Sequence, residues 1–442
     1  MTEDNKKKVE LLLPAGGLDT LVTAVQYGAD AVYIGGQRFG LRAKADNFSL
    51  EDMKQGIKYA HENGVKVYLT VNIFAHNDDI KAVGAYFDEI RNIGLDAVLI
   101  SDPGLFMLAK EYMPEMELHV STQANNTNYE TFKFWYKMGA KRVVCARELS
   151  LKEIAEIRQN IPEDLEIEAF MHGAMCISYS GRCLLSSYLA GRDANRGLCT
   201  HPCRWKYAVV ERSNGQLIEN NNEKQDVEFA VVEENRPGEY MPIEEDERGT
   251  YIFNSKDLCM IEHIPEMIEA GIYSFKIEGR MKTKLYVASA ARTYREAIDD
   301  YLESEELYRS KIEHYKEEIA ACTFRQFTTG FYFGKPDQDT QIYDSNTYIR
   351  NYIYLGAIEE ICPDGRVVVF QKNKFLVGDE IEIMDFRKGD IAAKVVKIED
   401  ENGREMESAP HPKQKLYLTL SCGEVTLSEG MLLRMKDAEM TE

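Results

Sequence analysis

Short apolar, often β-branched runs alternate with longer amphipathic segments from Glu10 to about Tyr301. Segments such as residues 50–63 and 79–93 place apolar residues at helical spacing on one side and charges on the other. This alternation is typical of repeated βα units around a parallel sheet. The runs that read as strands are residues 10–13, 31–34, 65–71, 97–101, 118–122, 142–146, 165–170 and 274–277. Eight strands close a (β/α)8 TIM-like barrel, so we predict an α/β fold of that type.

The periodicity changes near Tyr343, where apolar and polar residues begin to alternate as they do in strands. The runs are residues 348–361, 367–371, 380–384, 392–398 and 415–420, and Gly, Asp and Asn separate them. We therefore predict a small antiparallel β-barrel as a C-terminal domain. The expected domains are residues 1–325 for the TIM-like barrel and residues 340–442 for the β-barrel.

The connection after the seventh predicted strand is unusually long, from about residue 172 to residue 251. Long connections of this kind are usually functional. Its second part, residues 225–249, is rich in Glu, Asp, Asn, Pro and Gly, and we interpret it as a solvated, acidic insertion. A helix-like stretch at residues 257–270 then restores the βα pattern.

Polar side chains at the carboxyl ends of barrel strands line the active face of this fold. Lys276, Glu278 and Arg280 alternate along one strand, so their side chains share a face that could bind an anion. A buried ion-pair network is the alternative for these three residues. His172 directly follows a strand and is a candidate for acid–base chemistry or a metal neighbour, against a purely structural hydrogen-bonding role. These four residues are our catalytic candidates.

Four of the nine cysteines lie close together in the long connection: Cys176, Cys183, Cys199 and Cys203. The spacing C-x6-C-x15-C-x3-C would suit a tetrahedral zinc ion or an iron–sulfur cluster, because both bind deprotonated sulfur. Structural zinc sites typically use tight C-x2-C pairs, so the wide spacing on the active face favours iron. Cys259 is an alternative fourth ligand in place of Cys203.

The formal net charge of -21 implies that a nucleic-acid partner would need a local basic patch. Arg182, Arg192, Arg196 and Arg204 lie in the cysteine-containing connection among aromatic residues, a combination that can track phosphates and stack bases. Alternatively, these arginines neutralise a bound cluster or pair with the acidic insertion. The chain has no apolar stretch long enough for a signal peptide or a membrane span, so we expect a cytoplasmic protein without a membrane partner.

Several longer motifs resemble the U-32 peptidase family, also called collagenase-like proteases. The most specific is EAFMHGAMCISYSGRC at residues 168–183, and further matches occur at residues 12–16, 33–36, 254–258 and 276–280. The resemblance covers most of the chain, including the C-terminal domain. It implies an iron–sulfur cluster of the 4Fe-4S type on the four clustered cysteines.

Within the family, the Cys199 and Cys203 pair followed by Arg204 and Trp205 is similar to bacterial members that act on tRNA. That similarity implies oxygen-independent hydroxylation of the wobble uridine to 5-hydroxyuridine, with prephenate, a small dicarboxylate, as a requirement. Hydroxylation of another RNA and a collagenase-like peptidase activity are the alternatives. No H-E-x-x-H motif and no Ser-His-Asp partner set is visible for a peptidase. The sequence leaves open whether the chain forms a homo-oligomer or a hetero-oligomer with a family relative.

Overall fold

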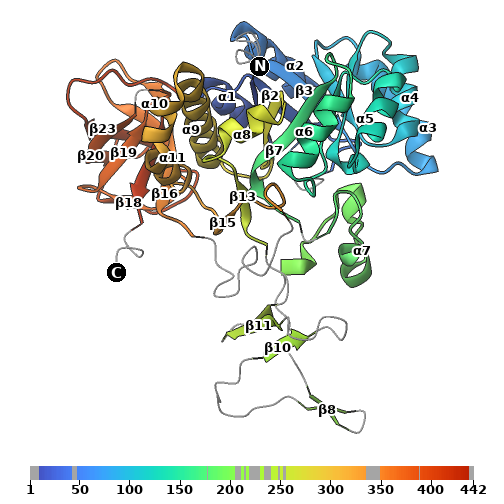
Figure 1. Cartoon of the computed structure of the whole chain (residues 1–442). Coiled ribbons are helices and arrows are strands. Elements are labelled where there is room, and N and C mark those ends of the chain that lie inside the picture. The colour runs from blue at the N-terminus through green and yellow to red at the C-terminus, as the bar shows by residue number, and fades with distance from the viewer. Residues whose placement is uncertain are drawn as a thin grey trace.

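The computed structural model describes residues 9–41, 47–176, 178–204, 255–334, 349–387 and 389–437, together with five short strands between residues 211 and 251. The chain folds into two closed barrels joined side by side (Figure 1).

Eight parallel strands form the larger barrel, as the sequence predicts. They run in the order β14-β1-β2-β3-β4-β5-β6-β7, and the pairing of β14 with β7 closes the ring. The register at the closure sets Ser274 beside both Glu10 and Glu168. The strands are β1 (Glu10–Pro14), β2 (Ala31–Gly35), β3 (Lys66–Val71), β4 (Ala97–Ile100), β5 (Glu117–Val120), β6 (Arg142–Val144), β7 (Glu166–Ala174) and β14 (Ser274–Ile277).

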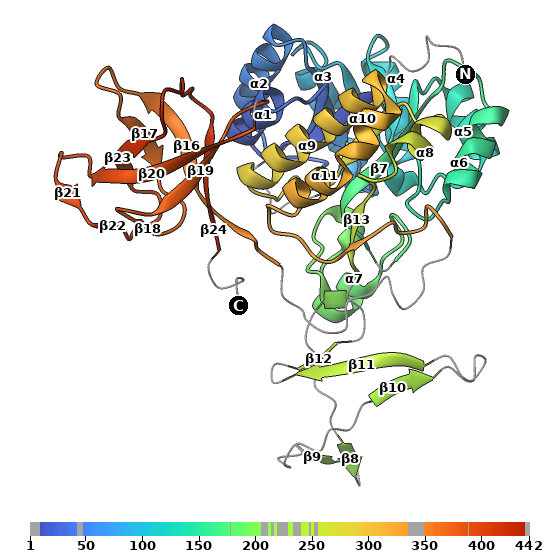
Figure 2. The ribbon, with the colours of Figure 1, turned by 60° about the vertical axis from the view of Figure 1, so that its left-hand side comes forward.

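Amphipathic helices cover the outside of this barrel (Figure 2). In α2, the Ser49 hydroxyl accepts a hydrogen bond from the Asp52 backbone, and the Asp52 carboxylate accepts one from Ser49, which fixes where the helix begins. The covering helices are α1 (Leu18–Gln26), α2 (Leu50–Glu62), α3 (Asn77–Ile90), α4 (Pro103–Tyr112), α5 (Tyr129–Met138), α6 (Leu151–Asn160), α8 (Ile264–Glu269), α9 (Lys284–Glu303), α10 (Glu305–Ser310) and α11 (Ile312–Ile319).

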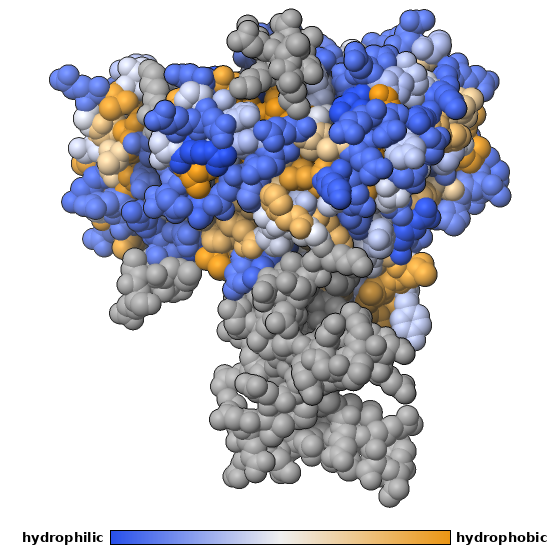
Figure 3. Space-filling model, in the orientation of Figure 1, coloured by the Kyte–Doolittle hydropathy of each residue, from blue (hydrophilic) through white to orange (hydrophobic). Residues whose placement is uncertain are grey.

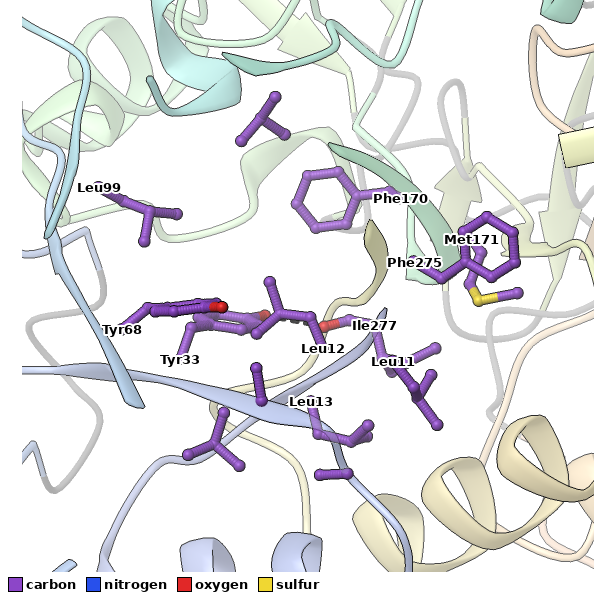
Figure 4. Packing of buried hydrophobic residues seen from close by; sticks show 14 of the residues in the cluster. Leu11, Leu12, Leu13, Tyr33, Tyr68, Leu99, Phe170, Met171, Phe275 and Ile277 are labelled. Atoms are coloured by element: carbon purple, nitrogen blue, oxygen red, sulfur yellow. Dashed lines mark hydrogen bonds between the residues drawn. The ribbon is translucent and has the colours of Figure 1, made fainter. Parts of the chain in front are cut away.

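Alternation along the strands divides the apolar core into an inner and an outer part. Tyr33, Tyr68 and Phe170 point toward one another inside the barrel, whereas Leu11 and Phe275 point away from its centre (Figure 4). All five side chains are buried. The inner ring of large side chains fills the middle of the barrel.

The segment after the long connection differs from our expectation. We predicted a helix over residues 257–270, but β13 (Asp257–Cys259) comes first and only the later part forms α8. β13 pairs antiparallel with β7 and parallel with β15 (Phe327–Thr328). These pairings join residues that are distant in sequence, and they override the local helical pattern.

The long connection contains more regular structure than a solvated excursion. Its first part forms α7 (Leu185–Ala190) and the short 3-10 turns η3 (Ala194–Arg196) and η4 (Pro202–Arg204). β8 (Glu211–Ser213) pairs with β9 (Gln216–Ile218) before the predicted acidic insertion. In and directly after the insertion, β10 (Phe229–Val232), β11 (Tyr240–Asp246) and β12 (Gly249–Tyr251) form an antiparallel sheet. An apolar run at residues 229–232 supplies β10 despite the acidic surroundings. Both ribbon views show these strands apart from the barrel, on the side where α7 lies (Figures 1 and 2).

The predicted C-terminal β-barrel is also confirmed. Six strands close it in the order β19-β24-β16-β17-β23-β20, with β20 pairing back to β19. The sequence did not reveal β24, which lies between β19 and β16. The bounds are β16 (Tyr352–Ile361), β17 (Val367–Phe370), β18 (Phe375–Leu376), β19 (Glu380–Met384), β20 (Asp390–Glu399), β21 (Glu405–Met406), β22 (Ser408–Ala409), β23 (Lys415–Ser421) and β24 (Leu432–Lys436).

Buried charges hold the two barrels together. Arg292 on α9 forms ion pairs with Glu318 on α11 and with Asp390 at the start of β20, at 2.7 Å for the latter. Arg434 on β24 is 1% exposed and also pairs with Asp390. Within the described part of the chain, no helix is both long and apolar enough to span a membrane.

Candidate active site

A cavity of about 680 Å³ lies at the carboxyl ends of the barrel strands, under the segment that carries the clustered cysteines. Residues from most strand ends contribute to it, as the barrel prediction requires. They include Tyr33 on β2, Asn72 after β3, Ser121 after β5, Arg147 after β6 and Lys276 on β14. The volume is in the range that holds a small molecule or a nucleobase.

Lys276 at the cavity floor is the end of a buried charge network. Its Nζ lies 2.8 Å from a carboxylate oxygen of Glu168, which is fully buried inside the barrel. Glu168 also pairs with Arg142 at 3.2 Å, and Arg142 pairs with Glu10 at 2.6 Å. The network therefore runs through the barrel from the first residue of β1 to the cavity. Both readings of Lys276 apply: it belongs to a buried ion-pair network, and it lines the cavity.

Glu10 shows how strongly the network holds its charges. Burial alone would raise the pKa of this carboxyl, but the Arg142 guanidinium and hydrogen bonds from Arg142, Tyr68 and Ser274 lower it from 4.5 to about 2. The pKa of Glu168 is lowered as well, because Lys276 and Arg142 outweigh the effect of its burial. Both carboxylates are consequently ionised at neutral pH.

Two glycines, Gly16 and Gly35, leave the space that Arg280 occupies. A Cβ at Gly35 would lie 1.6 Å from the Arg280 Nη1, and a Cβ at Gly16 would lie 2.0 Å from the Arg280 carbonyl oxygen. Arg280 Nη2 donates to the Leu41 carbonyl at 2.5 Å, and the residue is only 6% exposed. Two of the family-like motifs, at residues 12–16 and 33–36, thus serve to place one guanidinium at the cavity.

Glu278 pairs with Arg147 at 2.9 Å, and the Arg147 guanidinium also lies over the Phe170 ring. Cationic side chains outnumber carboxylates around the cavity. The cations are Arg147, Lys276, Arg280, Lys282 and Arg325, and the carboxylates are Glu148 and Glu278. The cavity therefore favours an anionic ligand although the whole chain is acidic.

The four clustered cysteines all line this same cavity. Cys176 is exposed, and Cys183, Cys199 and Cys203 are half-buried. In number and chemical type they fit an iron–sulfur cluster or a zinc ion. Among the described residues, no three His, Cys, Asp or Glu side chains converge closely enough to hold a metal ion.

Cys259 lies elsewhere, and it does not line the cavity. It pairs with His172 across β13 and β7, and its Sγ lies 3.6 Å from the Tyr294 hydroxyl. Burial raises the pKa of the Cys259 thiol to about 11. Of the two alternatives for a fourth ligand, Cys203 lines the same cavity as the other three cysteines and Cys259 does not.

His172 also lies outside the cavity lining. It is 2% exposed, its Nδ1 is 3.2 Å from the Tyr294 hydroxyl, and aromatic rings of Tyr286 and Phe327 pack beside it. Burial lowers the pKa of His172 to about 3, with a smaller effect from Lys282. This environment supports the structural alternative for His172 over an acid–base role.

The predicted RNA-contacting arginines are not equivalent. Arg182 and Arg192 are exposed, whereas the Arg196 guanidinium pairs with Asp79 on α3 at 3.0 Å. Arg196 therefore ties the connection to the barrel. The side chain of Arg204 is outside the described residues.

Several cavity residues come from positions that sequence reasoning missed. Arg325, Tyr286, Asn195 and His201 line the cavity, but none follows a predicted barrel strand. His201 could have been suspected from its place between two cysteines, and its Nδ1 lies 3.9 Å from the Cys199 Sγ.

Comparison with known proteins places these features in context. The sequence model of peptidase family U32 matches residues 16–342, and that of the U32 C-terminal domain matches residues 350–434. The chain is 40% identical to tRNA hydroxylation protein P of Escherichia coli strain K12, over 98% of each chain. It is 38% identical to tRNA hydroxylation protein P1 of Bacillus subtilis strain 168, covering 92% of this chain and 91% of the relative. A collagenase of Porphyromonas gingivalis strain W83 is 32% identical, covering 89% of this chain and 91% of the relative.

Proposed function

The chain belongs to peptidase family U32, and from that premise we propose that it is a tRNA-modifying enzyme that hydroxylates the wobble uridine to 5-hydroxyuridine. The observation that carries the proposal is the similarity to tRNA hydroxylation proteins of two bacteria over nearly the full length of both barrels. The cavity of about 680 Å³ under the segment that carries the clustered cysteines and the arginines supports this proposal, because a base must leave its stack to be modified.

The cationic residues fall into two groups, one for a small anion and one for tRNA. We assign Lys276 and Arg280 to a small dicarboxylate such as prephenate, because both cations are fixed at the cavity by buried partners. Glu278, paired with Arg147, positions that guanidinium beside them. We assign the exposed Arg182 and Arg192 to tRNA phosphates.

We further propose that Cys176, Cys183, Cys199 and Cys203 bind a 4Fe-4S cluster. When bound, such a cluster would supply one-electron transfer, which suits a hydroxylation that does not use molecular oxygen. The shared cavity wall supports this ligand set, and assembly would draw the four thiols together.

One observation favours a second candidate function, a cysteine peptidase. The Cys199 thiol and the His201 imidazole lie 3.9 Å apart in the cavity, which is a plausible nucleophile and base. A collagenase among the relatives points the same way. A cysteine that ligates a cluster cannot also serve as this nucleophile, so the two functions are separable by experiment.

The test uses protein purified anaerobically, with iron and sulfide measured before assay. We expect 5-hydroxyuridine in an unmodified tRNA transcript incubated with the protein and prephenate, detected by mass spectrometry of the nucleosides, and loss of product with Lys276→Met. Cleavage of gelatin by the same sample, abolished by His201→Ala and accompanied by no RNA product, would establish the peptidase instead. Hydroxylation of a ribosomal RNA fragment but not of tRNA would correct the substrate.

A further inference from the structure

Four exposed apolar side chains lie at the N-cap of α7, on α7 itself and just after η3. Leu184 is 71% exposed, Tyr188 88%, and Leu189 and Leu198 42% each. We call these four residues the apolar rim. Leu184 and Tyr188 are four residues apart on one helical turn, so their side chains share a face. Figure 3 shows apolar surface at the place that α7 occupies in Figure 1.

The apolar rim borders the cavity directly. Cys183 and Leu185, the neighbours of Leu184 on both sides, line the cavity, and so does Cys199 beside Leu198. Leu184 itself points to solvent. The rim therefore lies beside the cavity wall.

The rim is held on the barrel by specific hydrogen bonds. Asn195 Nδ2 donates to the Cys183 carbonyl at 3.1 Å, and the Asn195 carbonyl accepts a hydrogen bond from the Phe74 backbone at 3.1 Å. The backbone N–H of Ser180 donates to Glu148 at 2.9 Å. These contacts fix the backbone that carries the rim relative to the cavity, as a binding element requires.

The charges around the apolar rim indicate which kind of partner binds there. Between residues 176 and 204 the chain has four arginines and a single carboxylate, Asp193, which caps η3 by accepting from the Asn195 backbone. Two copies of this chain each carry a net charge of -21 and repel each other overall, so charge does not favour a second copy as the occupant. Single-stranded RNA combines anionic phosphates with flat apolar base faces, and it matches both properties of the rim.

We propose that Leu184 and Tyr188 form a stacking wedge for the bases that flank the nucleotide entering the cavity. The wedge rests on the proposed function and deepens it, because it explains how an RNA loop is opened. The Tyr188 ring stacks on one flanking base, and Leu184 fills the space that the extruded base leaves. Arg182 and Arg192 contact the neighbouring phosphates.

The experiment measures binding of an anticodon stem–loop RNA that carries 2-aminopurine next to the target uridine. We expect Tyr188→Ala to weaken binding by about tenfold and to abolish the change in 2-aminopurine fluorescence, since the variant loses one base–aromatic stack. Tyr188→Trp should bind like the wild type. Phe134→Ala is the matched control, because it removes an aromatic ring that is 46% exposed on α5, away from the cavity.

A fully paired RNA of equal length separates stacking from general charge attraction, and Tyr188→Ala should leave its affinity unchanged. Equal loop binding by wild type and Tyr188→Ala would overturn the wedge while wild-type hydroxylation still supports the proposed function. A wild-type dimer that Tyr188→Ala dissociates, with RNA binding intact, would assign the rim to self-association instead. Wild-type protein that binds and hydroxylates no RNA would refute the proposed function itself.

Discussion

Replacing Arg142 with methionine removes the centre of the buried charge network and keeps the side chain's apolar bulk. The change leaves Glu10 and Glu168, which are 6% and 0% exposed, without their shared guanidinium. Burial opposes the charge of Glu10, but Arg142 and hydrogen bonds lower the pKa of this carboxyl from 4.5 to about 2, so the ionised form stabilises the fold at neutral pH. Loss of a buried charge partner typically costs about 3–5 kcal/mol, and we expect a loss of that size for Arg142→Met.

The pH dependence of this loss has a definite sign. In the wild type, the lowered pKa of Glu10 stabilises the fold above pH 4.5, and this contribution disappears as the pH falls toward 2. In Arg142→Met, burial without a cation raises the pKa of Glu10, so ionisation at neutral pH opposes folding. The variant's deficit in stability should therefore be larger at pH 7.5 than at pH 5.

Thermal unfolding followed by circular dichroism at both pH values measures this difference. Arg309→Met is the control, because Arg309 is exposed on α10 and pairs only across the helix surface with Glu305. We expect a clear fall in Tm for Arg142→Met and almost none for the control. A fall no larger than that of the control, or one that grows as the pH is lowered, would refute the reasoning.

Three further predictions concern the cavity and its surroundings. Cys203→Ser should lower the iron bound per chain, whereas Cys259→Ser should leave it unchanged; equal losses in elemental analysis would contradict the ligand set. Gly35→Ala should raise the KM for prephenate by about tenfold or more, because the added Cβ occupies the place of a guanidinium. Gly40→Ala should not, because its added Cβ would be in ordinary contact, with the nearest atom at 3.6 Å. His172→Phe should lower Tm and leave the pH profile of turnover between pH 6 and 8 in place, since the pKa of His172 is about 3; a lost ionisation in that profile would show an acid–base role.

The barrel could be predicted from sequence because its signal is local. Each strand is a short apolar run such as residues 97–100, and each is separated from the next by an amphipathic helix. β13 and β24 were missed for a common reason. Both are stabilised by pairing with strands that are far away in the chain, and a local pattern does not report such partners.

In the candidate site, too, local sequence predicts some features and not those that depend on distant contacts. Strand-end residues such as Lys276 and Arg280 could be placed at the cavity from the barrel alone. The sequence could not show which of these residues are fixed by buried partners, because Glu168 contacts Lys276 only through the closure of the barrel. Likewise, the spacing of cysteines does not say that Cys259 turns toward Tyr294 rather than toward the cavity.

The central claim is that this chain hydroxylates tRNA, and nucleoside analysis of cellular tRNA tests it most directly. Total tRNA would be taken from a strain that lacks the gene and from the same strain supplied with wild-type protein or with Cys176→Ala. We predict that 5-hydroxyuridine and nucleosides derived from it are lost in the deletion, return with the wild type, and do not return with Cys176→Ala. Unchanged 5-hydroxyuridine in the deletion strain, in the absence of a second family member, would contradict the account.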